Sequence, residues 1–347
     1  MMRSPTPPRI GRSALILGAE CMTDSSSEDR RLLVSMSIGQ TAYAAWARQA
    51  RRERFFNIAR LLEASAAVKQ VRAEHALHRL GEVSRTIANI DRALAGLEPE
   101  AVATGPVTGT SPFQRELLER AVRALAAGCD LTYTELGDLF VCSTCGHLME
   151  GEPPPFCPEC GTVREGFLGF RIVDGMGTLG PSTIVRRLEQ GMRTVQDLVG
   201  GLTEEQLSTP VNGLPAFKDL IGHLIDMDIV FRERAWMILE TNQPKLSSAH
   251  PPTLGHAVKY RTVPIDDLLE QYISSRQQTL NLLRGLTQAA WQRIGFHEIF
   301  GPIPLLHQGN WVVSHEQGHL IELAQMRHNL LHKGNQVATV VYEVFNS

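Results

Sequence analysis

Apolar residues recur at helical spacing over most of the chain, which predicts a mainly α-helical protein. In the N-terminal part, two long runs rich in Ala, Leu, Arg and Glu (residues 32–62 and 66–97) predict an antiparallel helix pair. A loop rich in Gly and Pro is expected over residues 98–112, followed by one more helix over 113–127. The first 27 residues have Pro and Ser clusters and little periodicity, so a flexible lead-in is expected there.

The second half of the chain contains four further segments with helical periodicity. They are residues 183–199, 217–241, 265–286 and 310–332. Four helices of this length, joined by loops, predict a four-helix bundle. The connection over residues 242–264 is long for a compact domain, and long ordered loops often form lids or walls of sites.

These patterns divide the chain into four predicted parts. They are a lead-in (1–27), an N-terminal helical unit (28–139), a short cysteine-rich unit (140–170) and a C-terminal bundle (179–335). A length of 347 residues agrees with two or three domains.

Composition excludes several classes of partner. Hydrophobic residues make up 43% of the chain, charged residues 20%, and the formal net charge is −3, so the chain resembles ordinary soluble proteins. No long basic run suggests a nucleic acid partner. No apolar stretch approaches 18 residues, and the apolar patch near the N-terminus is too short for a secretory signal, so we expect a cytoplasmic protein without a membrane partner.

Four of the six cysteines form two CxxC pairs separated by eleven residues. They are Cys142, Cys145, Cys157 and Cys160. Four thiolates on two tight turns suit a tetrahedral Zn²⁺ or a single iron. Gly146 and Gly161 follow the pairs and allow backbone amides to turn toward the sulfurs. The spacing therefore predicts a zinc or iron site in a unit too small for an apolar core.

Residues 142–167 contain CxxCG, GEPPP and CPECG followed by an aromatic residue, and they resemble the rubredoxin-type module of rubrerythrins. That resemblance implies iron and single-electron transfer. His147 stands where the family usually has an aromatic residue, which leaves zinc as an alternative.

The N-terminal helices resemble the ferritin-like helix pair of rubrerythrins. The family needs a Glu on the first helix and Glu-x-x-His on the second to hold two irons. The matching positions carry Gln40, Lys69 and Arg72, and the next Glu would fall at Leu97. The resemblance therefore implies the fold without the di-iron peroxide chemistry. The N-terminal unit has one helix fewer than the family, and the resemblance therefore implies a homodimer in which a second subunit completes the bundle.

The sequence His315-Glu316-Gln317-Gly318-His319 reads as HExxH, the zinc motif of a metalloprotease helix. A protease of that type needs a further ligand downstream, and beyond Glu322, on the same helix, the chain offers only Glu343. Two histidines four residues apart do lie on one helix face and can share a metal. A metal site that is not a protease site is thus expected.

His223 lies on an apolar helix face, in the segment GLPAFKDLIGHLIDMD. This segment, together with FHEIFGPIPLLHQGNW and SHEQGHLIELAQMRH, resembles the DinB-like family of metal-binding four-helix bundles. The resemblance implies that His223, His315 and His319 bind a divalent ion (Zn, Ni or Fe) and leave positions open. Glu316 is expected to support the ligands or to lie on the helix surface, and no residue is assigned as catalytic.

Three more histidines, His256, His297 and His307, are expected on loops. They could line the pocket, although exposed polar residues are the more ordinary interpretation.

Three functions fit these features. The first is a metal-dependent transferase or hydrolase that acts on a small molecule and uses water or a low-molecular-weight thiol. The second is a non-catalytic stress-related or scaffold protein with structural metals. The third is a rubrerythrin-type electron-transfer protein, which the missing di-iron ligands disfavour.

Overall fold

The structure is a computed structural model that describes residues 16–95, 111–171, 174, 176–210, 215–246 and 257–332. It is mainly helical, as the periodicity predicts. The chain divides into two compact units, residues 1–110 and residues 111–347. The helix over 112–126 belongs to the second unit, whereas the sequence analysis grouped it with the first; the four-part division stays a prediction.

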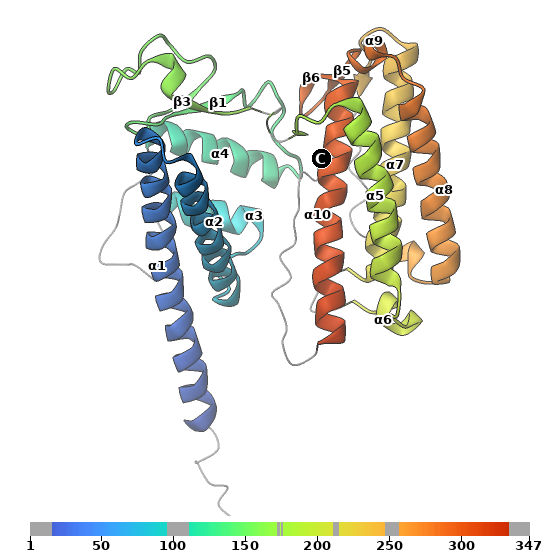
Figure 1. Cartoon of the computed structure of the whole chain (residues 1–347), viewed down its shortest axis with the longest axis horizontal. Helices are drawn as coiled ribbons and strands as arrows, with labels where there is room; N and C mark the ends of the chain where they lie inside the picture. The colour runs from blue at the N-terminus through green and yellow to red at the C-terminus, as the bar shows by residue number, and fades with distance from the viewer. Residues whose placement is uncertain are drawn as a thin grey trace, which may run out of the picture. The chain divides into compact units, whose positions relative to one another are not determined.

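The first unit consists of α1 (Ile16–Arg52), α2 (Phe56–Arg79) and α3 (Thr86–Leu94), with α1 and α2 side by side (Figure 1). The ion pairs Arg51–Glu63 and Arg79–Asp29 link their opposite ends, so the helices are antiparallel as predicted. Their buried contact is formed mostly by alanines. They are Ala47, Ala50, Ala59, Ala66, Ala73 and Ala76.

The predicted boundaries of this helix pair are wrong. The structure ends α1 at Arg52, because Arg54 adopts a left-handed backbone conformation (φ 67°) that an α-helix cannot continue. Gly81 (φ 70°) likewise follows the end of α2, so the run expected to reach residue 97 is split into α2 and α3. Helix α1 also begins at Ile16, inside the expected lead-in, whose residues 1–15 lie outside the described ones.

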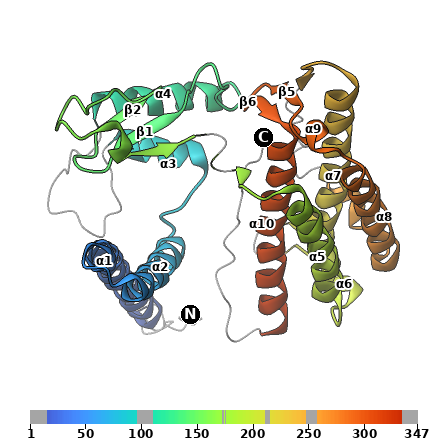
Figure 2. The same ribbon diagram turned by 45° about the horizontal axis from the view of Figure 1, so that its top comes forward.

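The second unit contains the predicted four-helix bundle, which the structure confirms. Its helices are α5 (Pro181–Val199), α7 (Phe217–Glu240), α8 (Ile265–Arg284) and α10 (Leu305–Leu331). Helix α10 contacts α5 and α7, and α8 contacts the same two helices from the other side (Figures 1 and 2). One apolar cluster surrounds Trp291 and Trp311, and another surrounds Phe217 and Tyr272.

Shorter elements complete the second unit. They are α4 (Pro112–Ala126), the 3₁₀ turns η2 (Arg164–Gly166) and η4 (Ala257–Tyr260), α6 (Glu204–Ser208), α9 (Gln288–Trp291), and two small sheets. The cysteine-rich unit contains the antiparallel sheet β2 (Leu148–Glu150), β1 (Leu139–Cys142), β3 (Phe167–Phe170). The second sheet has the order β4 (Lys245–Leu246), β5 (Ile294–His297), β6 (Gly301–Pro304), and β6 leads directly into α10. Residues 247–256 of the expected long loop lie outside the described part.

A buried ionic network connects the bundle helices. The Arg276 guanidinium on α8 donates to Asp228 on α7 (2.9 Å) and to Glu316 on α10 (2.5 Å), and all three residues are at most 3% exposed. The hydroxyl of Tyr272 also donates to Glu316 (2.9 Å). On α5, Gly191 leaves the space for this carboxylate, because a Cβ there would overlap it. The network therefore fixes the relative positions of four helices.

Among the described helices, none has the length and apolar content needed to cross a membrane.

Candidate metal centres

Helices α7 and α10 bring the three predicted histidines together. His315 and His319 point from one face of α10, and His223 faces them from α7. The Nε2 atom of His315 lies 3.2 Å from that of His223 and 3.3 Å from that of His319. Two nitrogens each about 2.0 Å from a tetrahedral ion are separated by roughly 3.3 Å, so the spacing fits a shared metal. We call these residues the three-histidine cluster.

The surroundings of the cluster keep two of its imidazoles, those of His223 and His315, neutral. Burial, reinforced by the neighbouring histidines, lowers the pKa of His315 well below its usual value. Burial also lowers the pKa of His223 to about 4, with a further contribution from His319. A neutral imidazole has the free lone pair that a metal requires. The cluster can therefore accept a dication at neutral pH without first releasing protons from these two rings.

Glu322 orients one of the ligands. Its carboxylate is 1% exposed and lies 3.1 Å from Nδ1 of His319, one helical turn away on α10. A proton on Nδ1 that is donated to the carboxylate leaves Nε2 as the unprotonated nitrogen, facing the cluster. Sequence analysis noted Glu322 only as an unsuitable third ligand. Its position three residues after a candidate ligand is the signal that could have identified this role.

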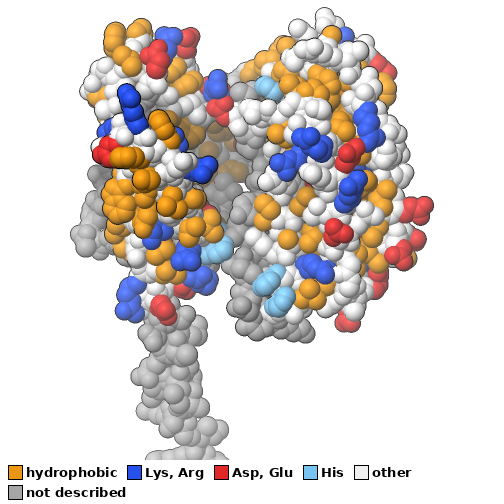
Figure 3. Space-filling view, in the orientation of Figure 1, with side chains coloured by type: hydrophobic (Ala, Val, Ile, Leu, Met, Phe, Trp, Pro, Cys, Tyr) orange, Lys and Arg blue, Asp and Glu red, His pale blue; other side chains and the backbone are white. Residues whose placement is uncertain are grey.

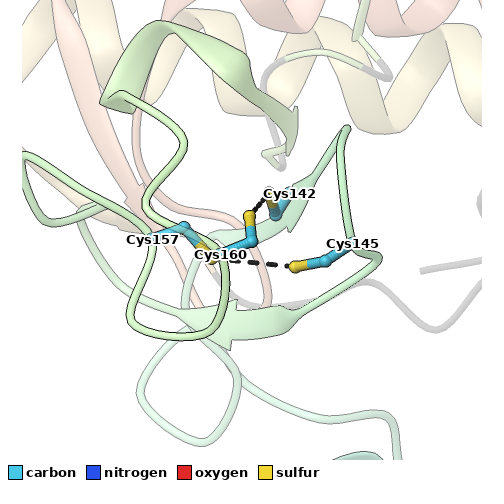
Figure 4. Close-up of side chains that lie close together, drawn as sticks. All are labelled: Cys142, Cys145, Cys157 and Cys160. Carbon is cyan, nitrogen blue, oxygen red and sulfur yellow. Dashed lines mark hydrogen bonds between the residues drawn. The ribbon is translucent and has the colours of Figure 1, made fainter.

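The four cysteines of the CxxC pairs also converge (Figure 4). The Sγ atoms of Cys142 and Cys160 are 3.6 Å apart, and those of Cys145 and Cys157 are 3.8 Å apart. Thiolates about 2.3 Å from a tetrahedral zinc are separated by roughly 3.8 Å, so the donor set fits Zn²⁺ or a single iron. The glycines after the pairs, Gly146 and Gly161, have φ of 78° and 73°, as a tight turn at those positions requires.

Local hydrogen bonds favour the thiolate form at two of the four cysteines, Cys142 and Cys160. Burial alone would raise the pKa of Cys142, but backbone N–H groups of Cys145 and Thr144 lower it to about 6. The hydroxyl and backbone of Thr162 lower the pKa of Cys160. Both thiols are thus favoured in the deprotonated form that binds metal.

Comparison with known proteins bears on the bundle alone. Residues 187–323 match the model of the DinB superfamily. The C-terminal bundle is a DinB superfamily domain. One similar solved structure is that of YfiT from Bacillus subtilis, described as a probable metal-dependent hydrolase with an unusual four-helix bundle topology. It is 18% identical over 44% of this chain and 90% of that chain, with a TM-score of 0.40. No curated protein matches the chain significantly.

Within the DinB domain, Glu316 does not lie on the helix surface. It is 3% exposed, and its hydrogen bonds run to Tyr272 and Arg276 on α8 rather than to the histidines. The expectation of a surface position is wrong because α5 and α8 pack against that side of α10. Glu316 therefore contributes to helix packing, while Glu322 is the carboxylate that contacts a candidate ligand.

The remaining predicted residues have varied positions. His297 lies on β5 and is 1% exposed, and His307 lies in the first turn of α10, so neither is on a loop; His256 is outside the described residues.

Arg327, which follows the histidine pair, donates to the carbonyls of Leu198 and Gly200 and so caps the C-terminus of α5.

Among their described residues, the N-terminal helices carry no comparable cluster. The side chain of Lys69 on α2 packs against Gly39 of α1, next to Gln40, at the position where rubrerythrins have a carboxylate. In the part of the chain that the structure describes, two clusters contain at least three possible metal ligands, the three histidines and the four cysteines, and neither includes a residue of α1 or α2. The resemblance of this unit to rubrerythrin remains a prediction.

Proposed function

We propose that the DinB domain binds one divalent ion through His223, His315 and His319 and is a metal-dependent transferase or hydrolase. The observation that carries the proposal is the convergence of three buried or half-buried Nε2 atoms, one of them oriented by Glu322. A divalent ion with neutral ligands supplies Lewis-acid chemistry and lowers the pKa of a bound water or thiol. The surrounding protein keeps the His223 and His315 rings neutral, Glu322 fixes the His319 ring, and Arg276 is paired with carboxylates away from the cluster.

Partial exposure favours an enzyme over a scaffold. A purely structural site would be closed on all sides, yet His223 is only half-buried. We propose that a small molecule or a low-molecular-weight thiol reaches the cluster beside His223, its least buried member. We propose Zn, Ni or Fe at this cluster, and Zn or Fe at the four cysteines, where the metal stabilises a unit with little apolar core.

Metal analysis tests the proposal. Purified wild-type protein is expected to contain about two metals per chain, and His315→Ala and Cys142→Ala about one each, because the two donor sets are independent. His332→Ala is the matched control, because it changes an exposed histidine at the C-terminal end of α10. Its metal content is expected to be unchanged. Full metal content in His315→Ala would refute the metal centre.

A spectroscopic measurement separates the enzyme from the alternatives. In Co²⁺-substituted protein, the difference between the visible spectra of wild type and His223→Ala reports the ion at the three-histidine cluster. Addition of 2-mercaptoethanol is expected to change this difference spectrum, because the ion has a ligand position open to exchange. An unchanged difference spectrum would favour the scaffold. Iron and a redox-active visible spectrum at the cysteine site would favour electron transfer.

We further propose that the first unit mediates a homodimer. Large apolar residues are exposed along α1 and α2, where Figure 3 shows hydrophobic side chains gathered. They include Ile38, Trp46, Phe56, Leu61 and Val68, each at least 51% exposed. An apolar surface of this kind usually marks an interface, and a two-fold dimer places the same surface on both subunits.

Light scattering after size-exclusion chromatography tests the dimer. Wild-type protein is expected to have twice the mass of the chain, and the double variant Ile38→Lys, Leu61→Lys the mass of a monomer, because burying the lysines is costly. Trp236→Lys, at an exposed apolar residue of α7, is the control and should remain dimeric. A monomeric wild type would contradict the proposal.

A further inference from the structure

A pocket beside the three-histidine cluster is lined by apolar residues and by side chains with hydrogen-bond donors. It lies where α7, the β5–β6 hairpin and the start of α10 meet. The apolar residues are Met176, Phe231, Phe300 and Ile303, and the polar ones are Arg234, His297, Gln308 and Trp311. The enclosed space admits about one group the size of a water molecule, so it suits at most a single small polar head group and not a whole substrate.

Three polar atoms in this pocket have no hydrogen-bond partner. They are Nε2 of His297, Nε2 of Gln308 and Nε1 of Trp311. Their residues are 1%, 5% and 6% exposed, so solvent at the protein surface does not satisfy them. Buried polar groups are nearly always paired, because an unpaired one loses its hydrogen bonds to water without replacement. Three such atoms in one pocket indicate a ligand that completes it.

The hairpin fixes His297 as a donor. Its Nδ1 accepts hydrogen bonds from the backbone N–H groups of Ile299 (3.1 Å) and Phe300 (3.3 Å). In a neutral imidazole the proton must then be on Nε2, which faces the pocket. Burial, together with the positive charge of Arg234, lowers the pKa of His297 to about 4, so the ring is neutral at pH 7.

All the unpaired polar groups of the pocket are therefore donors, and Arg234, 8% exposed, adds a positive charge. A water molecule could accept two of the N–H groups, but its own two protons would then face donors. A carboxylate has only acceptors, about four lone-pair sites on two oxygens, and a charge opposite to that of Arg234. The donor set thus favours a carboxylate over a water.

Trp311 joins the pocket to the three-histidine cluster. Its indole ring stacks on His315, with ring centroids 4.9 Å apart and an interplanar angle of 22°, while its N–H is buried unpaired in the pocket. Gln308, Trp311 and His315 follow one another at helical spacing on α10. A group bound in the pocket therefore lies about one helical turn from the candidate metal ligands.

We propose that this pocket binds the carboxylate of the substrate or thiol that reacts at the three-histidine cluster, through His297, Gln308, Trp311 and Arg234. The inference rests on the proposed function for the metal, but the carboxylate site itself consists of protein groups. The apolar lining, formed by Phe231 and Ile303 among others, would contact the carbon atoms next to the carboxylate.

The Trp311 indole N–H offers a direct probe. The chain has four tryptophans, so full-length, metal-containing protein with ¹⁵N-labelled indoles gives at most four indole NMR signals. Trp311→Phe removes one signal, which assigns it, and retains a ring against His315. Titration with butyrate is expected to shift that signal saturably, whereas neutral butyramide, of the same shape, should not shift it. Gln308→Leu should weaken butyrate binding by about 10-fold or more, and Gln278→Leu, on the exposed face of α8, should not.

Repeating the titration in His223→Ala separates this inference from the metal proposal. A persistent shift in that variant supports a carboxylate site made by the pocket, even if metal analysis disproves the metal centre. Loss of the shift there would place the carboxylate on the metal and overturn the inference. Equal shifts by butyrate and butyramide, or none by either, would also overturn it.

Discussion

Replacing Arg276 by alanine is expected to lower the free energy of unfolding of the bundle by about 3–5 kcal/mol. The side chain is 1% exposed and pairs with two carboxylates, Asp228 and Glu316, that are themselves buried. Removing it leaves two adjacent buried carboxylates without a counter-charge, each with only one hydroxyl donor, from Tyr272 to Glu316 and from Thr279 to Asp228. Their mutual repulsion and lost solvation exceed anything that a cavity of this size would cost.

Urea denaturation followed by far-UV circular dichroism measures this effect. Arg284→Ala is the matched control on the same helix, because Arg284 pairs with Glu189 where the two side chains are 44% and 33% exposed. That change should cost less than about 1 kcal/mol. Similar losses for the two variants would show that the buried network does not hold the bundle together.

Acidification should destabilise the metal-free bundle between pH 6.5 and about 4. His223 and His297 have folded-state pKa values of about 4, both lowered chiefly by burial, and burial shifts His315 in the same direction. Above pH 6.5 these rings are neutral in the folded and unfolded states. Below it the unfolded chain binds protons that the folded chain does not, so each ring lowers stability by about 1.4 kcal/mol per pH unit. Below about 4 His223 and His297 also protonate in the folded state, so the loss from these two rings levels off.

The test is the free energy of unfolding in urea at several pH values between 7 and 4, with chelator present. His297→Phe removes one of the rings and should reduce the slope of stability against pH by about 1.4 kcal/mol per unit, whatever it does to stability at pH 7. His332→Ala removes an exposed ring and should leave the slope unchanged. A wild-type stability that is constant from pH 7 to pH 5 would contradict the prediction.

The parts of the fold that could be predicted from sequence are those that depend on local spacing. The four bundle helices follow from periodicity, and the sharing of one helix face by His315 and His319 follows from their separation. The break between α1 and α2 could not be predicted in the same way, because the periodic pattern continues across it and Arg54 gives no turn signal. Gly81 was an available signal for the end of α2.

At the three-histidine cluster, the sequence allowed prediction of the candidate ligands but not of the residues that surround them. A helical wheel places Glu316 about 100° from its neighbouring histidine, but it does not say which helices cover that direction. Burial of Glu316 depends on Gly191 of α5 and Arg276 of α8, which are 125 and 40 positions away in the sequence. The donor pocket likewise requires the β5–β6 hairpin to bring His297 against the start of α10.

Because Gln308, Trp311, His315 and His319 share one continuous helix, the pocket and the candidate metal ligands cannot move apart independently. Four residues of α-helix rise about 6 Å, which corresponds to a span of four or five single bonds. Compounds that place a carboxylate this far from the reacting atom would satisfy both sites at once. Compounds with shorter or longer carbon chains would satisfy only one of the two sites, so the length of the carbon chain becomes a criterion for selecting substrates.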